Sequence, residues 1–256
     1  MIKTRIIDTH THLYDPVFDN DRAGVIQRAR EAGVEAIVSV SENIGHARRN
    51  IDLAAKYPIL FPAAGLYPTC LDFEQTEEMC HYIRIEHSKL VAIGEVGLDY
   101  WMVKEESQRE VQREIFKSFI DLSKEVNLPL NVHSRSAGRY AVAILLERGA
   151  RKVQLHAFDG KGATALQAAE AGFFFSLPPS VIRSRQKQKL IKRLPLSSLL
   201  IETDSPVLGP SPEKRNEPAN AVIAVDAIAE IKDVNRTEVL QTVYQNTRRL
   251  YGDLIS

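Results

Sequence analysis

Short runs of β-branched residues alternate with longer amphipathic segments along the whole chain, and this alternation constrains the fold most strongly. The predicted strands are Arg5–Asp8, Glu35–Val40, Ile59–Ala64, Leu90–Gly94, Leu128–His133, Lys152–His156, Gly172–Leu177 and Leu199–Thr203. The predicted helices between them are Asp21–Ala32, Ile44–Tyr57, Phe73–His87, Ser107–Val126, Ala137–Arg148, Lys161–Ala171 and Arg183–Leu194. A loop, Ser205–Pro218, and closing helices in Ala219–Ile255 complete the pattern.

This alternation predicts an α/β fold, because parallel strands need crossover connections and these are usually helical. The simplest closed arrangement of eight such units is a single (β/α)8 barrel of the TIM type over residues 1–256. An open, doubly wound sheet is the alternative.

The charge balance and the cysteines restrict the class of protein further. Lys and Arg together number 33, as do Asp and Glu, so no overall basic field attracts nucleic acid, and a polyanion must be held by local charge. Cys70 and Cys80 are too few for a disulfide framework and lack partners at zinc-finger spacing. With no apolar stretch long enough to span a bilayer, we expect a monomeric, cytoplasmic protein without a membrane partner.

Potential metal ligands gather at the predicted strand ends. They are His10 and His12 after the first strand, Glu95 after the fourth, His133 after the fifth, His156 after the sixth and Asp204 after the eighth. Residues two apart on a strand point to the same face, so His10 and His12 can meet at one point. Singly, each residue is as well explained by a hydrogen-bonded histidine or a capping carboxylate. Jointly they predict a metal site, because active sites of barrel enzymes lie at the C-terminal ends of the strands.

Six ligands exceed the need of one tetrahedral ion, which favours two divalent ions bridged by Glu95. One ion is expected on His10, His12 and Asp204, and the other on His133 and His156. Imidazoles and carboxylates suit zinc or manganese, with magnesium possible where carboxylates dominate. A water shared by two such ions has its pKa lowered from about 15.7 toward about 7, which makes it a nucleophile. Asp204 is the candidate general base, and the predicted reaction is hydrolysis.

Five segments carry these ligands among characteristic neighbours: Asp8–His12, Gly94–Tyr100, Val132–Arg135, Leu155–Gly160 and Glu202–Pro206. In this order they resemble the signatures of TatD-family metallohydrolases of the amidohydrolase superfamily, most closely the branch shared by eukaryotes and archaea. The resemblance implies a (β/α)8 barrel and a binuclear centre on the residues named above. It also implies hydrolysis of phosphodiester bonds in DNA from a 3′ end, and we expect single-stranded DNA as the substrate.

One departure from the family pattern concerns substrate binding. After the third strand the family usually reads Gly-x-His-Pro, whereas this chain has Tyr67 at the histidine position. A phenol can still donate a hydrogen bond to a phosphate oxygen, so Tyr67 is a candidate substrate-binding residue. Arg135 is a second, as a bidentate phosphate ligand, and Ser180 and Asn216 on other barrel-top loops complete the set.

Two aromatic and basic features have alternative interpretations. Trp101 follows the Glu95 motif and either stacks a base or caps the barrel. The basic run Arg183–Arg193 is either the exposed face of a helix or a patch that follows a nucleic-acid backbone.

Two other functions compete with a deoxyribonuclease. The same metal site suits an ester hydrolase of the D-aminoacyl-tRNA deacylase type, since an activated water attacks an ester readily. A non-catalytic binding protein with a structural metal is the third hypothesis, and structural sites are typically closed by four tetrahedral ligands.

Overall fold

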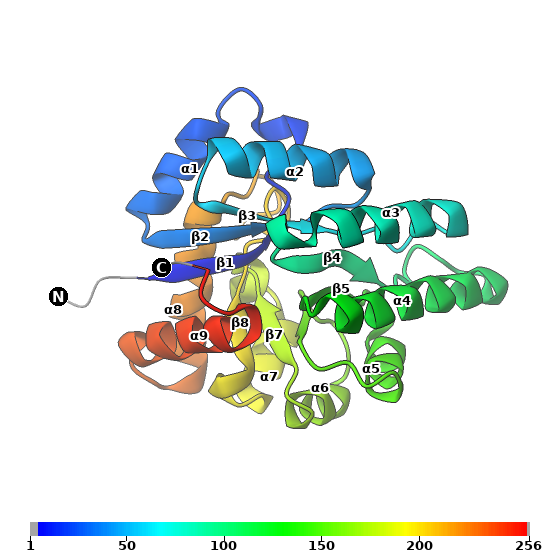
Figure 1. Ribbon diagram of the computed structural model, residues 1–256. Coiled ribbons are helices and arrows are strands. Elements are labelled where there is room, and N and C mark those ends of the chain that lie inside the picture. The colour runs from blue at the N-terminus through cyan, green and yellow to red at the C-terminus, as the bar shows by residue number, and fades with distance from the viewer. Residues whose placement is uncertain (1–4, 255–256) are drawn as a thin grey trace.

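The computed structural model describes residues 5–254, which form eight parallel strands with helices arranged around them (Figure 1). The strands are β1 (Ile6–Thr11), β2 (Val34–Ser39), β3 (Leu60–Ala64), β4 (Ala92–Gly97), β5 (Leu130–His133), β6 (Val153–Leu155), β7 (Phe174–Leu177) and β8 (Leu199–Ile201). Each strand pairs in parallel with the next along the chain, in the order β1 to β8. The predicted (β/α)8 barrel is thus confirmed, and the open doubly wound sheet is excluded.

Helices connect the strands and cover the outside of the barrel. They are α1 (Arg22–Glu31), α2 (Ile44–Lys56), α3 (Phe73–Glu86), α4 (Glu106–Val126), α5 (Gly138–Glu147), α6 (Gly162–Glu170), α7 (Arg185–Arg193), α8 (Ala221–Lys232) and α9 (Arg236–Tyr251). Short 3-10 turns are η1 (Pro16–Phe18), η2 (His87–Lys89), η3 (Pro179–Arg183), η4 (Leu196–Ser198) and η5 (Pro218–Asn220). Between residues 5 and 254 no helix combines the length and apolar character that crossing a bilayer requires. Ile255, the end of the predicted closing helices, lies outside the described residues.

Side chains join the two ends of the strand order. The Asp8 carboxylate accepts hydrogen bonds from the backbone N–H of Thr203 at 2.8 Å and from its hydroxyl at 2.5 Å. The hydroxyl of Thr9 donates to the carbonyl of Ile201 at 2.8 Å, and the N–H of Asp204 donates to the carbonyl of His10 at 2.8 Å. These bonds place Asp204 beside His10 of β1 and His12 just after it.

Every strand differs from its predicted range by one to three residues at one or both ends, and the ends of β1, β4 and β8 bear on the site. β1 continues to Thr11 and β4 to Gly97, so His10 and Glu95 lie within strands rather than after them. β4 extends because Gly97 pairs in register with His133 of β5. β8 ends at Ile201, since the N–H of Thr203 binds the Asp8 side chain rather than a neighbouring strand.

Candidate metal centre

The carboxylate of Glu95 lies at the centre of the barrel mouth and faces two pairs of imidazoles. Its Oε1 is 2.6 Å from Nδ1 of His133 and 3.1 Å from Nε2 of His156. Its Oε2 is 3.6 Å from Nε2 of His12 and 3.9 Å from Nε2 of His10. Each oxygen therefore faces one pair of imidazoles, which is the geometry that a bridging carboxylate requires.

Asp204 completes the group on the side of β1. Its Oδ1 lies 3.3 Å from Nε2 of His12 and 3.5 Å from Nε2 of His10, while these two nitrogens are 3.3 Å apart. The residue has a φ of 56°, a left-handed conformation that aspartate tolerates better than most residues. The six ligands predicted from the sequence thus lie together, and every side chain except the slightly exposed His12 is more than nine-tenths buried.

Close packing between neighbouring strands brings His133 to this position. Gly97 has a φ of 141°, and a Cβ on it would lie 2.1 Å from the carbonyl oxygen of His133. The neighbouring Leu98 donates its N–H to that same oxygen at 3.0 Å. Only glycine fits this contact, so the glycine after Glu95 allows the two ligand-bearing strands to approach.

Hydrogen bonds fix the tautomers of His10 and His133. Nδ1 of His10 lies 2.8 Å from Oδ1 of Asn131, whose own N–H groups donate to Thr9 and Tyr251. The Asn131 oxygen must therefore accept, and His10 carries its proton on Nδ1. Likewise the Asp99 carboxylate, 2.9 Å from Nε2 of His133, holds the proton of that ring on Nε2. Both rings present an unprotonated nitrogen to Glu95.

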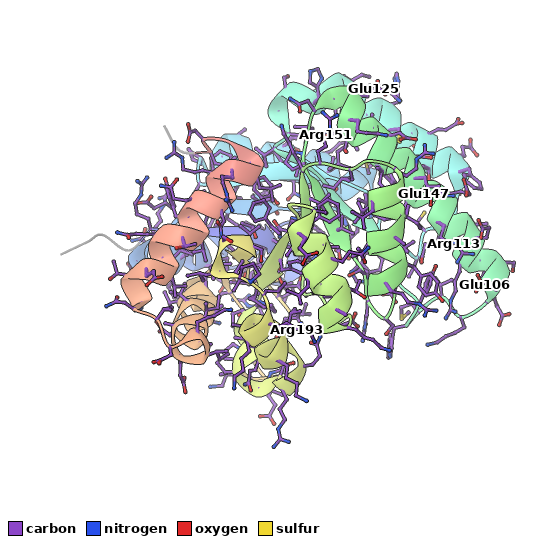
Figure 2. The ribbon with its side chains drawn as sticks, turned by 90° about the horizontal axis from the view of Figure 1, so that it is seen from below. Glu106, Arg113, Glu125, Glu147, Arg151 and Arg193 are labelled. Atoms are coloured by element: carbon purple, nitrogen blue, oxygen red, sulfur yellow. The ribbon has the colours of Figure 1, made fainter. Side chains whose placement is uncertain are left out.

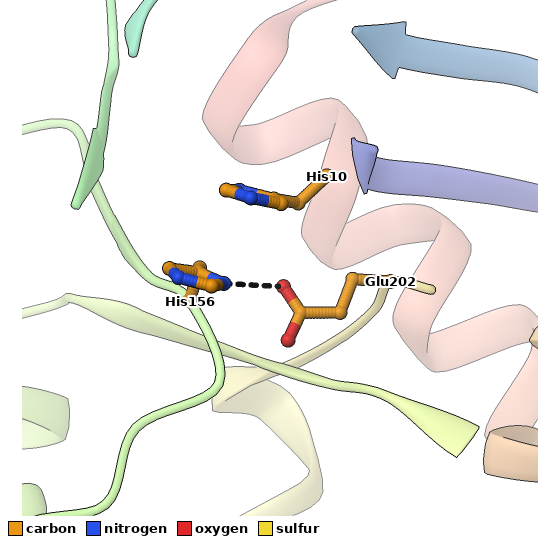
Figure 3. Close-up of side chains that lie close together, drawn as sticks. All are labelled: His10, His156 and Glu202. Carbon is orange, nitrogen blue, oxygen red and sulfur yellow. Dashed lines mark ion pairs between the residues drawn. The ribbon is translucent and has the colours of Figure 1, made fainter. Parts of the chain in front are cut away.

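The other two imidazoles are oriented in the same way. Nδ1 of His12 is 3.3 Å from the hydroxyl of Tyr14, which in turn donates to the Glu42 carboxylate at 2.7 Å. Figure 3 shows His156 stacked on His10, with ring centroids 3.9 Å apart, and its Nδ1 directed at Glu202 at 3.6 Å. The Nε2 atoms of both rings therefore point inward, toward Glu95.

The convergence of four bare imidazole nitrogens and two carboxylates fits a metal centre. Nδ1 of His133 lies 2.6 Å from Oε1 of Glu95, a contact that either a proton or a metal ion between the two atoms satisfies. Nitrogen and carboxylate oxygen together suit zinc, manganese and related divalent ions. Two clusters, each built from two histidines and Glu95, have ligand atoms within 4.8 Å of one another.

The same neighbours keep both carboxylates ionised. Burial alone would raise the pKa of Glu95, but His133 and His156 hold this pKa well below its usual value when they carry protons in place of a metal ion. Burial would also raise the pKa of Asp204, yet His10 and His12 lower it when they donate protons to its carboxylate in place of a metal ion. Ionised carboxylates are the form that a metal ion or a proton-accepting base requires.

A cavity of about 500 Å³ opens above the centre and is lined by His12, Glu95, Asp204 and two predicted substrate residues. The Tyr67 ring stands edge-on to His133, with centroids 5.2 Å apart. The Arg135 guanidinium lies 3.8 Å from the ring centroid of Trp101, whose indole is half exposed. Tyr67 and Arg135 are thus positioned to meet a ligand in the cavity.

Ser180 and Asn216, the other two predicted substrate residues, are not among the residues that line this cavity. The Asn216 amide is fully buried and donates to the carbonyls of Thr203 at 2.7 Å and Val207 at 2.8 Å. Ser180 is also buried, and its N–H donates to the carbonyl of Leu208 at 2.9 Å. Through these contacts both residues brace the loop that carries Asp204, and their role in substrate binding stays a prediction.

Comparison with known proteins identifies the family to which this chain belongs. The sequence model described as TatD related DNase matches residues 7–252. The chain belongs to the TatD family. The human protein "Deoxyribonuclease TATDN3" is 41% identical over 261 residues, covering 97% of this chain and 95% of the human protein. "Uncharacterized metal-dependent hydrolase YabD" of Bacillus subtilis is 36% identical over 254 residues, covering 96% of this chain and 98% of that protein.

A solved structure agrees with the TatD fold. The crystal structure of YJJV, a TatD homolog from Escherichia coli, superimposes with a TM-score of 0.90 at 28% identity and covers 98% of this chain and 99% of its own. The expected class of metal-dependent hydrolase is thereby confirmed.

Lys187 is a cavity residue of this TatD protein that the sequence analysis missed. It was included in a run interpreted as an exposed helix face or a nucleic-acid patch, but its side chain is more than nine-tenths buried and lines the cavity. Its ammonium donates to the carbonyl of Ala157 at 2.9 Å. The signal was present, because Lys187 shares its helix face with the buried apolar residues Leu190 and Ile191, at spacings of three and four.

Proposed function

We propose that this TatD protein hydrolyses phosphodiester bonds of DNA at a centre of two divalent ions, zinc, manganese or magnesium. The observation that carries the proposal is the division of the Glu95 oxygens between two pairs of imidazoles. One ion would be held by His10, His12, Asp204 and Glu95, and the second by Glu95, His133 and His156. When bound, such a pair of ions supplies a water of lowered pKa and stabilises charge on the reacting oxygens.

Other steps, the acceptance of a proton and the binding of phosphate, fall to side chains of the cavity. Asp204 is ionised and lines the cavity, so it can accept the proton of the attacking water. Arg135 and Lys187 place positive charge around the cavity, where they can bind phosphate oxygens. The Lys187 ammonium uses one of its three protons on Ala157 and keeps two for a ligand. Tyr67 can donate its phenolic proton.

The size and openness of the cavity favour a strand end as substrate. A volume of about 500 Å³ suits a ligand of one or two nucleotides. The half-exposed Trp101 beside Arg135 offers a surface on which a base can stack. We therefore propose an exonuclease on single-stranded DNA, and its 3′ to 5′ direction rests on the resemblance to the TatD family. A purely structural metal is disfavoured, because structural sites are closed, whereas His12, Glu95 and Asp204 face the open cavity.

The test uses the metal-stripped protein reconstituted with Mn²⁺, Mg²⁺ or Zn²⁺ and a 5′-labelled single-stranded oligonucleotide. We expect a ladder of products shortened from the 3′ end, which a blocked 3′ terminus would suppress. His133→Ala abolishes the ladder, while His81→Ala, at an exposed position of α3, leaves it unchanged. The absence of product with all three ions would refute the proposal. D-aminoacyl-tRNA is assayed in parallel, and its preferential hydrolysis would show that it, rather than DNA, is the substrate.

A further inference from the structure

A second cavity, of about 570 Å³, lies beside the metal centre between the start of α6 and one face of α7. Its basic lining residues are Lys161, Arg185, Lys189 and Arg193. Asp159 is the only acidic residue among the described residues that line it, and its carboxylate accepts the backbone N–H of Ser136 at 2.9 and 3.1 Å. We call this cavity the α6–α7 groove. In a chain with zero net charge it is a local concentration of positive charge.

The cations of the α6–α7 groove lack partners that surface cations elsewhere have. On α4, for example, Arg113 pairs with Glu106 at 2.7 Å, and both residues lie on the outer face shown in Figure 2. α7 contains no acidic residue, and within residues 5–254 the four groove cations form no ion pair with protein groups. Unpaired cations that line a concave surface are suited to bind an anion.

The spacing of the cations on α7 suits a linear anion. Arg185, Lys189 and Arg193 are four residues apart, so they form one stripe with steps of about 6 Å along the helix. This step is of the same order as the separation of successive phosphates in an extended single strand. Arg193, labelled in Figure 2, is held against α6 because Gly162 has no side chain: a Cβ there would lie 2.7 Å from Cδ of Arg193.

The groove adjoins the catalytic cavity. Asp159 lines both, and α7 supplies cations to both, since Lys187 faces the catalytic cavity and Lys189 faces the groove. We propose that the α6–α7 groove binds the phosphates of a nucleic-acid single strand whose end occupies the metal centre. This inference rests on the proposed function and deepens it, because it assigns a path to the part of the substrate away from the reacting bond.

The test compares three full-length proteins: the wild type, Arg185→Glu with Lys189→Glu, and a control with Arg151→Glu and Lys192→Glu. The control reverses two exposed charges that do not line the groove, and so carries the same change in net charge. Binding of fluorescein-labelled oligothymidylates of 4 and 12 nucleotides is measured by anisotropy in chelator, which prevents cleavage. Hydrolysis of bis(p-nitrophenyl) phosphate with Mn²⁺ reports on the metal centre alone.

We expect the groove variant to bind the 12-mer at least tenfold more weakly than the wild type. The slope of the logarithm of the binding constant against the logarithm of salt concentration should become shallower by about 1.4, because two phosphate contacts are lost. Its binding of the 4-mer and its hydrolysis of bis(p-nitrophenyl) phosphate should match the wild type, and the control should match it in all assays. Equal binding of the 12-mer by groove variant and wild type would overturn the inference. If the wild type hydrolyses neither DNA nor bis(p-nitrophenyl) phosphate while groove-dependent binding persists, the proposed function fails and the groove remains a nucleic-acid site.

Discussion

Nδ1 of His10 donates to Oδ1 of Asn131 at 2.8 Å, and this bond turns the other nitrogen of the ring toward Glu95 and Asp204. Asn131 is itself fixed, because its amide donates to the carbonyl of Thr9 and to the hydroxyl of Tyr251. The C-terminal helix α9 therefore contributes, through Tyr251, to the orientation of a ligand on the first strand.

Replacement of Asn131 should weaken metal binding, although Asn131 contacts Nδ1 of His10, the ring nitrogen that points away from Glu95 and Asp204. In Asn131→Ala the imidazole is free to turn and to change tautomer, and loss of such a partner typically costs about 10- to 100-fold in metal affinity. Competition with a zinc-sensitive dye measures the affinity.

Asn50→Ala is the matched control. Asn50 of α2 is also buried, but it bonds the hydroxyl of Ser39 and the carbonyl of Val40 rather than a candidate metal ligand. We expect it to lower the denaturation midpoint without changing metal affinity. Equal metal affinities of the two variants would show that Asn131 does not orient His10.

Glu95→Gln should reduce the metal content from two ions to at most one per chain. An amide has one oxygen to offer, and its N–H₂ group would face the bare nitrogens of the other pair of imidazoles. Hydrolysis should fall by more than about 100-fold, the upper end of the cost of losing an outer partner of a metal ligand. Inductively coupled plasma mass spectrometry counts the ions.

The control for charge is Glu147→Gln, at an exposed position at the end of α5 (Figure 2). It should keep both the metal content and the rate of the wild type. Two ions retained in Glu95→Gln would rule out Glu95 as the bridge.

The convergence of the six candidate ligands could be predicted from the sequence because of where they lie in the fold. His10 and His12 are two residues apart, and the other ligands are close to the ends of strands that a parallel barrel must bring to one face. This reasoning needs only the order of the strands. The exact strand ends did not matter, so Glu95 was found although it lies within β4 rather than after it.

The residues that orient these ligands could not be predicted in the same way. The bond from Asn131 to Tyr251 joins residues 120 positions apart, and the contact of Asp8 with Thr203 spans 195 positions. Such pairs depend on the closure and register of the barrel, which periodicity does not specify. The position of Ser180 and Asn216 outside the cavity lining could not be predicted for a related reason, since loop residues can point into a cavity or brace the loop from behind.

Lys187→Met should impair the use of DNA and leave the metal content unchanged. Methionine keeps the length and the apolar packing of the side chain but removes the ammonium that lines the catalytic cavity. A hydrogen bond to a charged group contributes about 1.5–3 kcal/mol, which corresponds to a loss of roughly 10- to 150-fold in kcat/KM. Steady-state kinetics on a single-stranded oligonucleotide measure this loss.

Lys192→Met, at an exposed position of the same helix, is the control and should behave as the wild type. If Lys187→Met kept full kcat/KM with a normal metal content, the ammonium would have only a packing role against Ala157.

The resemblance to the family leads us to expect a histidine where this chain has Tyr67, so variants at this position test what its side chain contributes. Burial raises the pKa of the Tyr67 phenol, so at neutral pH the group is a protonated donor. Tyr67→Phe removes one neutral hydrogen bond, worth about 0.5–1.5 kcal/mol, and should lower kcat/KM for DNA by roughly 2- to 13-fold.

Tyr67→His should instead raise kcat/KM above the wild type, since an imidazole at this site can donate to phosphate and can also carry positive charge. The ring lies 5.2 Å from that of His133, so the metal content of each variant is measured alongside the kinetics, to separate loss of a substrate contact from loss of an ion. If Tyr67→Phe, with both ions bound, equalled the wild type on DNA, the phenol would make no contact with the substrate. The position would then serve only to pack against His133, and its difference from the family pattern would have no catalytic cost.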